Sequence, residues 1–164
     1  MAIEKVRQYF ARFGLENRIR ELDTSSATVE LAAEALGCEP RRIAKSLAFS
    51  LEEKPILIVA AGDAKIDNHQ YKERFGKKAK MLAPEETAAQ IGHAVGGVCP
   101  FAVNDGVTVY LDVSLKRFAT VFPACGSSNS AIELTLDELE QYSGFQDWVD
   151  VCKGWQNEEA PAGV

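Results

Sequence analysis

The stretch that decides the fold reads Ile43-Ala44-Lys45-Ser46-Leu47-Ala48-Phe49-Ser50-Leu51. Successive side chains of a β-strand point to opposite faces, so the alternation of large and small residues predicts a strand with one apolar face. Lys45 falls on that apolar face, between Ile43 and Leu47. A buried ammonium group requires an anionic partner, a lowered pKa or a pocket that opens to substrate, which makes Lys45 the first candidate functional residue. The alternative is a structural lysine whose stem covers apolar surface while its ammonium reaches water.

The composition fits one globular domain over residues 1–156, followed by a tail over residues 157–164 that we expect to be disordered. The chain has 164 residues, of which 46% are hydrophobic and 26% are charged. The longest apolar run, residues 56–61, is too short to span a bilayer, and residues 1–14 form an amphipathic pattern rather than a signal sequence. We therefore expect a cytoplasmic protein with no membrane partner.

The charge distribution gives two opposing indications. The net charge of -6 argues against broad binding to nucleic acid, so no DNA partner is expected. A local basic cluster opposes this total and consists of Lys72, Arg74, Lys77, Lys78 and Lys80. This cluster is either a patch that faces phosphate groups or the solvated end of a helix.

The cysteines and histidines do not form a recognisable site. The 4 cysteines (Cys38, Cys99, Cys125 and Cys152) contain no C-x-x-C pair, and the 2 histidines are His69 and His93. This spacing suits neither a zinc site nor a disulfide framework, so we expect free thiols, no metal and no cofactor. Motifs for phosphate-binding loops, zinc proteases and serine hydrolases are also missing from the sequence.

Helical and strand patterns alternate along the rest of the chain. Apolar spacing and terminal glycines predict helices over residues 3–13, 29–36, 71–75 and 84–92, and a last helix that begins with a capping box of Thr135 and Glu138. Further strands are predicted over residues 19–22, 55–61, 107–112, 118–124 and 131–134. Several strands are joined by links too short for a helical crossover, so we expect an α/β fold with a mixed sheet.

Two polar loops are candidates to lie near Lys45. Residues 62–67 follow the most apolar strand, and Asp63 is there a partner for Lys45, a partner for a ligand ammonium, or a helix cap. Residues 124–130 carry Gly126 and Ser127, whose small size suits contact with a ribose or an amino group. The alternative for this second loop is a plain turn.

A third loop, residues 96–101, carries paired glycines. Gly96 and Gly97 allow the backbone to approach a ligand and to aim N–H groups at a developing oxyanion, although such a pair also occurs in ordinary turns. Pro100 stiffens the loop, and Phe101 is placed to wall an apolar pocket. These residues predict a pocket centred on Lys45.

Taken in order, several motifs resemble the YbaK/EbsC family, the stand-alone relatives of the prolyl-tRNA synthetase editing domain. The resemblance covers residues 1–145 and rests on residues 28–33, 43–47, Gly62-Asp63 with Lys65 and Asp67, residues 96–101, Leu111-Asp112 with Leu115, and Ala124 with Gly126. It implies a mixed, partly barrel-like sheet surrounded by helices. One departure is Ala102, where many relatives carry glycine.

The resemblance also implies a function and a set of site residues. It implies a deacylase that acts in trans on mischarged aminoacyl-tRNA, often a small amino acid on tRNA(Pro), with the acceptor end of the tRNA as partner. Lys45 matches the key active-site lysine, and the implied substrate-binding positions are Asp63, Gly96, Gly97, Pro100, Phe101, Asp112, Gly126 and Ser127. None of these motifs contains an obvious general base, so the resemblance implies that a ribose hydroxyl of the substrate activates the water.

Two other functions remain open. The missing general base and the acidic net charge also fit a non-catalytic relative that binds aminoacyl-tRNA or docks on an aminoacyl-tRNA synthetase or another protein. A third hypothesis uses Lys45 as a Schiff-base nucleophile towards carbonyl compounds. The resemblance favours the deacylase, with Lys45 as an electrostatic and positioning residue.

Overall fold

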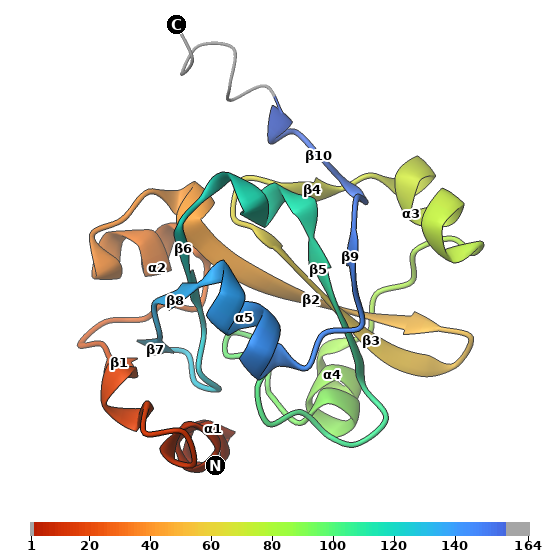
Figure 1. Cartoon of the computed structure of the whole chain (residues 1–164). Helices are drawn as coiled ribbons and strands as arrows, with labels where there is room; N and C mark the ends of the chain where they lie inside the picture. The colour runs from red at the N-terminus through yellow and green to blue at the C-terminus, as the bar shows by residue number, and fades with distance from the viewer. Residues whose placement is uncertain (1, 157–164) are drawn as a thin grey trace, which may run out of the picture.

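A curled, mixed sheet of six strands forms the centre of the computed structural model, which describes residues 2–156 (Figure 1). The strand order is β8-β6-β2-β3-β5-β9. The bounds are Ile43–Leu51 for β2, Lys54–Ala61 for β3, Thr108–Asp112 for β5, Thr120–Pro123 for β6, Leu134–Thr135 for β8 and Asp147–Val149 for β9. Strand β2 is antiparallel to β3 and parallel to β6, while β5 is parallel to both β3 and β9. The predicted mixed, partly barrel-like sheet is confirmed.

Short two-stranded ribbons complete the β-structure. Strand β1 (Arg20–Glu21) pairs with β7 (Ser130–Ala131), and β4 (Lys65–Ile66) pairs with β10 (Cys152–Lys153). The strand predicted over residues 131–134 is wrong as one element, because its start pairs with β1 and its end, in β8, pairs with β6. The strands β4, β9 and β10 were not predicted, because elements this short show no alternation of side chains.

Helices surround the sheet (Figure 1). They are α1 (Ala2–Ala11), α2 (Val29–Leu36), α3 (Asn68–Phe75), α4 (Pro84–Ile91) and α5 (Leu136–Ser143), with 3-10 turns η1 (Glu16–Arg18), η2 (Pro40–Arg42) and η3 (Val113–Arg117). The predicted capping box is confirmed, because Thr135 and Glu138 bond to each other's backbone N–H at the start of α5. Asp67, and not Asp63, caps α3 by accepting the N–H of Gln70 at 3.0 Å. Within residues 2–156, the helices are all too short or too polar to cross a membrane.

The core confirms β3 as the central strand, since the residues from Leu57 to Ala61 are 0% exposed. Strand β2 differs from its prediction, because its small residues Ala44 and Ala48 are also buried. Both faces of β2 are covered, whereas the sequence pattern indicated one apolar face. Lys45 and Ser46 are half-buried on this strand.

The outer edge of β2, opposite β3, is interrupted. Strand β6 pairs with it at Ile43 and Ala44. Further along, the Ser50 N–H donates to the Lys80 carbonyl at 2.8 Å and the Leu82 N–H donates to the Ala48 carbonyl at 3.0 Å. Between these contacts, no strand of residues 2–156 pairs with the outer edge of β2. The sheet therefore has a gap beside Lys45 and Ser46.

Candidate functional site

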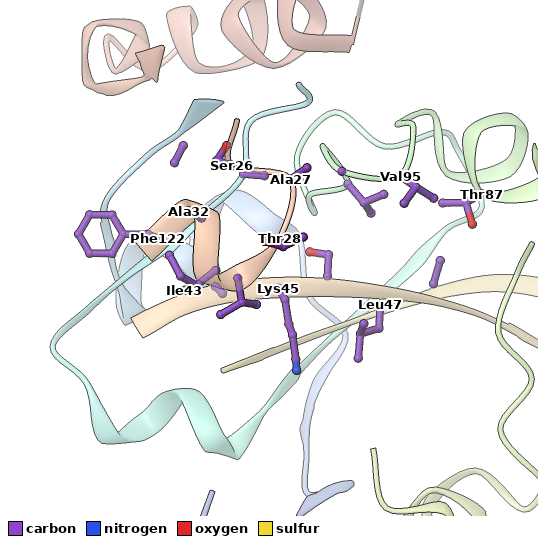
Figure 2. A pocket seen from close by; sticks show the side chains of 18 of the residues that line it. Ser26, Ala27, Thr28, Ala32, Ile43, Lys45, Leu47, Thr87, Val95 and Phe122 are labelled. Atoms are coloured by element: carbon purple, nitrogen blue, oxygen red, sulfur yellow. The ribbon is translucent and has the colours of Figure 1, made fainter. Parts of the chain in front are cut away.

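A cavity of about 340 Å³ lies over this gap in the sheet (Figure 2). Five parts of the chain contribute to its lining. They are residues 26–29 with Ala32, strand β2, Met81 and Leu82 with Thr87, Val95 and Gly96 with Val98, and Phe122 and Ala124 with residues 130–131. Most of the side chains are small or apolar, and the residues that line it include no histidine, aspartate or glutamate. The volume lies at the lower end of the range of small-molecule sites, about 300–1,000 Å³.

Lys45 belongs to the lining, but its ammonium lies on the far side of β2. The side chain points away from Ser26, Thr28 and Val95 (Figure 2), and Nζ donates to the Gly62 carbonyl at 3.3 Å. Burial lowers the pKa of Lys45 from its ordinary value of 10.5, and the nearby Cys152 thiol and Asp63 carboxylate oppose this effect only in part. The lysine is thus a half-buried cation held by a backbone carbonyl.

Asp63 pairs with an arginine instead of with Lys45. Its carboxylate accepts two N–H groups of Arg117, at 2.6 and 3.0 Å. A guanidinium presents parallel donors that match both carboxylate oxygens, so this pairing is stronger than a single ammonium contact. The expected Asp63–Lys45 pair is therefore wrong, and within residues 2–156 the ammonium of Lys45 forms no ion pair.

The paired glycines bring two predicted loops together. Gly96 lines the cavity, whereas Gly97 packs on the neighbouring loop, where a Cβ would lie 2.7 Å from the Gly126 carbonyl carbon and from the Ser127 nitrogen. Gly126 has φ +95° and leaves no room for a Cβ against the backbone of Ala2. Glycine is required at Gly97 and Gly126 by this close packing.

Pro100 and Phe101 do not line the cavity. Pro100 is buried beside it, and the Phe101 ring, 0% exposed, packs on Phe10 with ring centroids 4.8 Å apart. Val95 and Val98 form the apolar wall that the sequence assigned to Phe101. The next residue, Ala102, has φ +53°, a conformation that glycine adopts without strain. The loop backbone therefore has the conformation that a glycine would favour, although the residue is alanine.

Ser127 and Asp112 do not line the cavity, and both form hydrogen bonds to other parts of the protein. The Ser127 hydroxyl lies 2.7 Å from the Ser130 hydroxyl, and Ser130 lines the cavity. Asp112 is 0% exposed and accepts the N–H groups of Ser114 at 2.9 Å and Val151 at 3.0 Å. Its carboxylate, at the end of β5, therefore connects β5 with η3 and with the segment between β9 and β10.

Two hydroxyl groups in the cavity wall have no partner among residues 2–156. They are Ser26 Oγ, on a residue that is 8% exposed, and Ser46 Oγ on β2. A buried hydroxyl without a hydrogen bond is unfavourable, so unpartnered groups at a cavity point to a ligand. Neither residue was predicted from the sequence. The alternation in β2 assigned Ser46 to a polar face, and Ser26 lies in a polar segment before α2 that shows no such pattern.

Burial favours the protonated, weakly nucleophilic form of the Cys99 thiol. Burial raises the pKa of Cys99 to about 12, and it lowers the pKa of His93, whose Nε2 lies 2.8 Å from the Phe101 carbonyl. The thiol and the imidazole are therefore both neutral near pH 7. Residues 2–156 contain no cluster of acidic, cysteine and histidine side chains that could hold a metal ion.

The rim of the cavity is apolar and continues into the basic cluster. Met81 and Val95 line the cavity and are 62% and 64% exposed. Lys77, Lys78 and Lys80 are exposed on the segment that leads to Met81 and is bonded to β2. Positive charge therefore lies directly beside the cavity mouth in a chain whose net charge is -6.

Comparison with known proteins assigns the chain to one family. The profile of the aminoacyl-tRNA editing domain matches residues 23–142. The chain belongs to this family. The predicted resemblance to stand-alone relatives of the prolyl-tRNA synthetase editing domain is thereby confirmed.

Relatives of this editing domain include stand-alone and fused proteins. The chain is 57% identical over 157 residues to the uncharacterized protein YwhH of Bacillus subtilis (strain 168), covering 95% of the chain and 100% of YwhH. It is 31% identical over 137 residues to a proline–tRNA ligase of Geobacillus sp. (strain WCH70), covering 83% of the chain but 24% of the ligase. The crystal structure of a candidate trans-editing enzyme for prolyl tRNA synthetase matches with a TM-score of 0.83 and 29% identity, over 93% of this chain and 98% of that one.

Proposed function

We propose that this editing domain is a deacylase that acts in trans and removes a small amino acid from mischarged tRNA, with tRNA(Pro) as the expected carrier. The observation that carries the proposal is the cavity of about 340 Å³, which has small walls and two unpartnered hydroxyls in a member of the editing-domain family. Such a cavity has room for an aminoacyl group and part of the terminal ribose. Its walls exclude large side chains by size.

The reaction is hydrolysis of an activated ester. Water attacks the carbonyl carbon, a tetrahedral oxyanion forms, and the ester oxygen of the terminal ribose leaves with a proton from the water. The lining supplies no carboxylate or imidazole as a base, so the neighbouring ribose hydroxyl of the substrate is assigned the task of orienting the water. The protein then contributes positioning and stabilisation of the oxyanion.

Lys45 supplies positive charge from behind β2 and holds the turn after β3 through the Gly62 carbonyl. Its ammonium is less solvated than a surface lysine, which strengthens its field at the cavity. Gly62 itself has no space for a Cβ, which would lie 2.1 Å from the Pro40 carbonyl oxygen, so this turn is tightly packed. Lys45 is thus an electrostatic and positioning residue in the proposal.

The specificity test uses tRNA(Pro) charged with alanine, serine, proline or phenylalanine. We expect alanine or serine to be released at least about 10-fold faster than phenylalanine, since a pocket rejects a larger side chain by overlap. If the wild-type protein released all these amino acids at equal rates above the spontaneous rate, the cavity would not select substrates by size. Rates equal to the spontaneous rate for all of them would overturn the deacylase.

The missing base in the cavity lining also favours a second candidate, a non-catalytic module that binds aminoacyl-tRNA or a synthetase. The two candidates differ in turnover. A binding module protects the ester or releases at most one amino acid per protein molecule, whereas a deacylase used at one-hundredth of the substrate concentration consumes all of it.

The basic rim gives a separate prediction for the tRNA. Replacing Lys77, Lys78 and Lys80 with glutamine is expected to weaken tRNA binding and to reduce the slope of log Kd against log salt by about 2, because each phosphate contact contributes about 0.7–0.9. Fluorescence anisotropy with uncharged tRNA(Pro) measures this slope. The control variant changes Lys116 and Lys153, which are exposed on η3 and β10, and should leave the slope unchanged. An unchanged slope in the triple variant would exclude the basic rim from the interface.

A further inference from the structure

The gap in the outer edge of β2 has a defined hydrogen-bonding character. In an antiparallel strand the N–H and C=O of one residue point to the same side, and the direction reverses at the next residue. The Ala48 carbonyl and the Ser50 N–H both bond to the segment of residues 80–82 on the outer side. Even-numbered residues of β2 therefore direct their backbone groups outward, and Ser46 directs its N–H and C=O into the gap.

Two side chains in the cavity wall add further unpartnered groups. Ser46 Oγ is buried at the cavity wall without a partner within residues 2–156, and so is Ser26 Oγ, on the segment that precedes α2. Ser26 is fixed in place, because its N–H donates to the Ser128 carbonyl at 2.6 Å. The cavity thus presents a backbone donor, a backbone acceptor and an unpartnered hydroxyl at Ser46, and a second unpartnered hydroxyl at Ser26. The other hydroxyls of the lining, on Thr28, Thr87 and Ser130, already have hydrogen-bond partners.

An aminoacyl ester carries the complementary groups. Its ammonium is a donor and its carbonyl is an acceptor, and they are separated by one Cα, as the N–H and C=O of a strand residue are. Two such residues facing each other exchange a pair of hydrogen bonds. The aminoacyl group therefore matches the missing neighbour of Ser46.

The geometry points to a specific binding position for the substrate. The aminoacyl group docks on the outer edge of β2 as a one-residue strand, between β6 and residues 80–82. The Ser46 N–H donates to the ester carbonyl and to the oxyanion that forms from it, while the Ser46 carbonyl accepts the α-ammonium. The hydroxyls of Ser46 and Ser26 complete the contacts. This assignment rests on the proposed function and names the residue that binds the reacting carbonyl.

The test compares two substitutions at one position. Ser46→Ala removes the hydroxyl, and Ser46→Pro removes the hydroxyl and the backbone N–H. We expect Ser46→Ala to lower kcat/KM for alanyl-tRNA about 10-fold, and Ser46→Pro to lower it at least a further 100-fold through kcat, as loss of an oxyanion donor does. Proline is tolerated where a strand N–H faces outward without a partner, so both variants should keep the wild-type melting temperature within a few degrees.

Ser50→Ala is the matched control, because Ser50 lies on the same side of the same strand but outside the cavity lining. It should keep wild-type activity. A folded Ser46→Pro variant that is as active as Ser46→Ala would overturn the assignment of the N–H.

A second measurement decides the matter if Ser46→Pro does not fold, and it does not require catalysis. The probe is 3′-alanylamino-3′-deoxyadenosine, whose amide resists hydrolysis. In the wild-type protein, hydrogen exchange followed by NMR should show a Ser46 amide that exchanges faster than those of Lys45 and Leu47 and becomes protected when the probe binds. Turnover of alanyl-tRNA together with an unprotected Ser46 amide would overturn only the binding position at Ser46. Absence of both turnover and probe binding would overturn the proposed function as well.

Discussion

Replacing Lys45 with methionine is expected to lower deacylation of alanyl-tRNA about 100-fold while changing the free energy of unfolding by no more than about 1 kcal/mol. The activity falls because the charge behind β2 is lost. The free energy of unfolding changes little because methionine fills similar space. The lost hydrogen bond to Gly62 is offset by removal of a partly desolvated cation that has no ion pair within residues 2–156. Single-turnover kinetics and urea unfolding measure the two effects.

The pH dependence of this stability difference has a defined sign. The pKa of Lys45 is lowered in the folded state, so the folded protein binds this proton more weakly than the unfolded chain does. The protonated Lys45 therefore lowers the free energy of unfolding of the wild-type protein. This destabilisation is complete below the lowered pKa and disappears as the pH rises to the ordinary value of 10.5. Relative to wild type, Lys45→Met should thus be most favourable at neutral pH and lose this advantage in alkaline solution.

The control for charge is Lys45→Arg, which keeps the cation and should retain more activity than Lys45→Met. Full activity in Lys45→Met would exclude Lys45 from the mechanism. Reductive trapping of a carbonyl compound on Lys45 would instead support the Schiff-base alternative, which requires a reactive amine in contact with substrate.

Replacing Asp112 with alanine is expected to lower the free energy of unfolding by about 3–5 kcal/mol, because two buried N–H groups lose a carboxylate acceptor. These groups are the N–H of Ser114, in η3, and the N–H of Val151, which precedes β10. Since Asp112 is 0% exposed, the loss cannot be replaced by solvent without opening the fold. Urea denaturation followed by circular dichroism measures the change.

Asp105→Ala is the control for Asp112→Ala, because Asp105 is an exposed carboxylate on the loop before β5. We expect its substitution to change stability by less than about 0.5 kcal/mol. Wild-type stability in Asp112→Ala together with weaker substrate binding would contradict the structural role and favour the substrate-binding role predicted from the family resemblance.

The elements that the sequence predicted well are those whose signals are local. The apolar run of β3, the capping box at Thr135 and the glycine after α2 each depend on residues that are close in the chain. Strand β2 was located correctly, but its buried alanines and the position of Lys45 behind the cavity depend on what covers each face.

The features that the sequence could not predict depend on pairing between distant residues. Asp63 and Arg117 are 54 positions apart, and nothing local distinguishes this pair from Asp63 with Lys45. The gap at Ser46 exists because β6 ends its pairing at Ala44 and residues 80–82 begin theirs at Ala48. The free hydroxyls of Ser26 and Ser46 follow from that gap, so only the folded structure shows them.

Multiple turnover distinguishes a cavity that hydrolyses an aminoacyl ester from one that only binds it. The measurement is release of labelled alanine from alanyl-tRNA(Pro) at a 100-fold excess of substrate over protein, corrected for the spontaneous rate. We expect complete release by the wild-type protein and release near the spontaneous rate by Ser46→Pro. Release by the wild-type protein that stops at one equivalent, or that matches the spontaneous rate, would contradict this expectation.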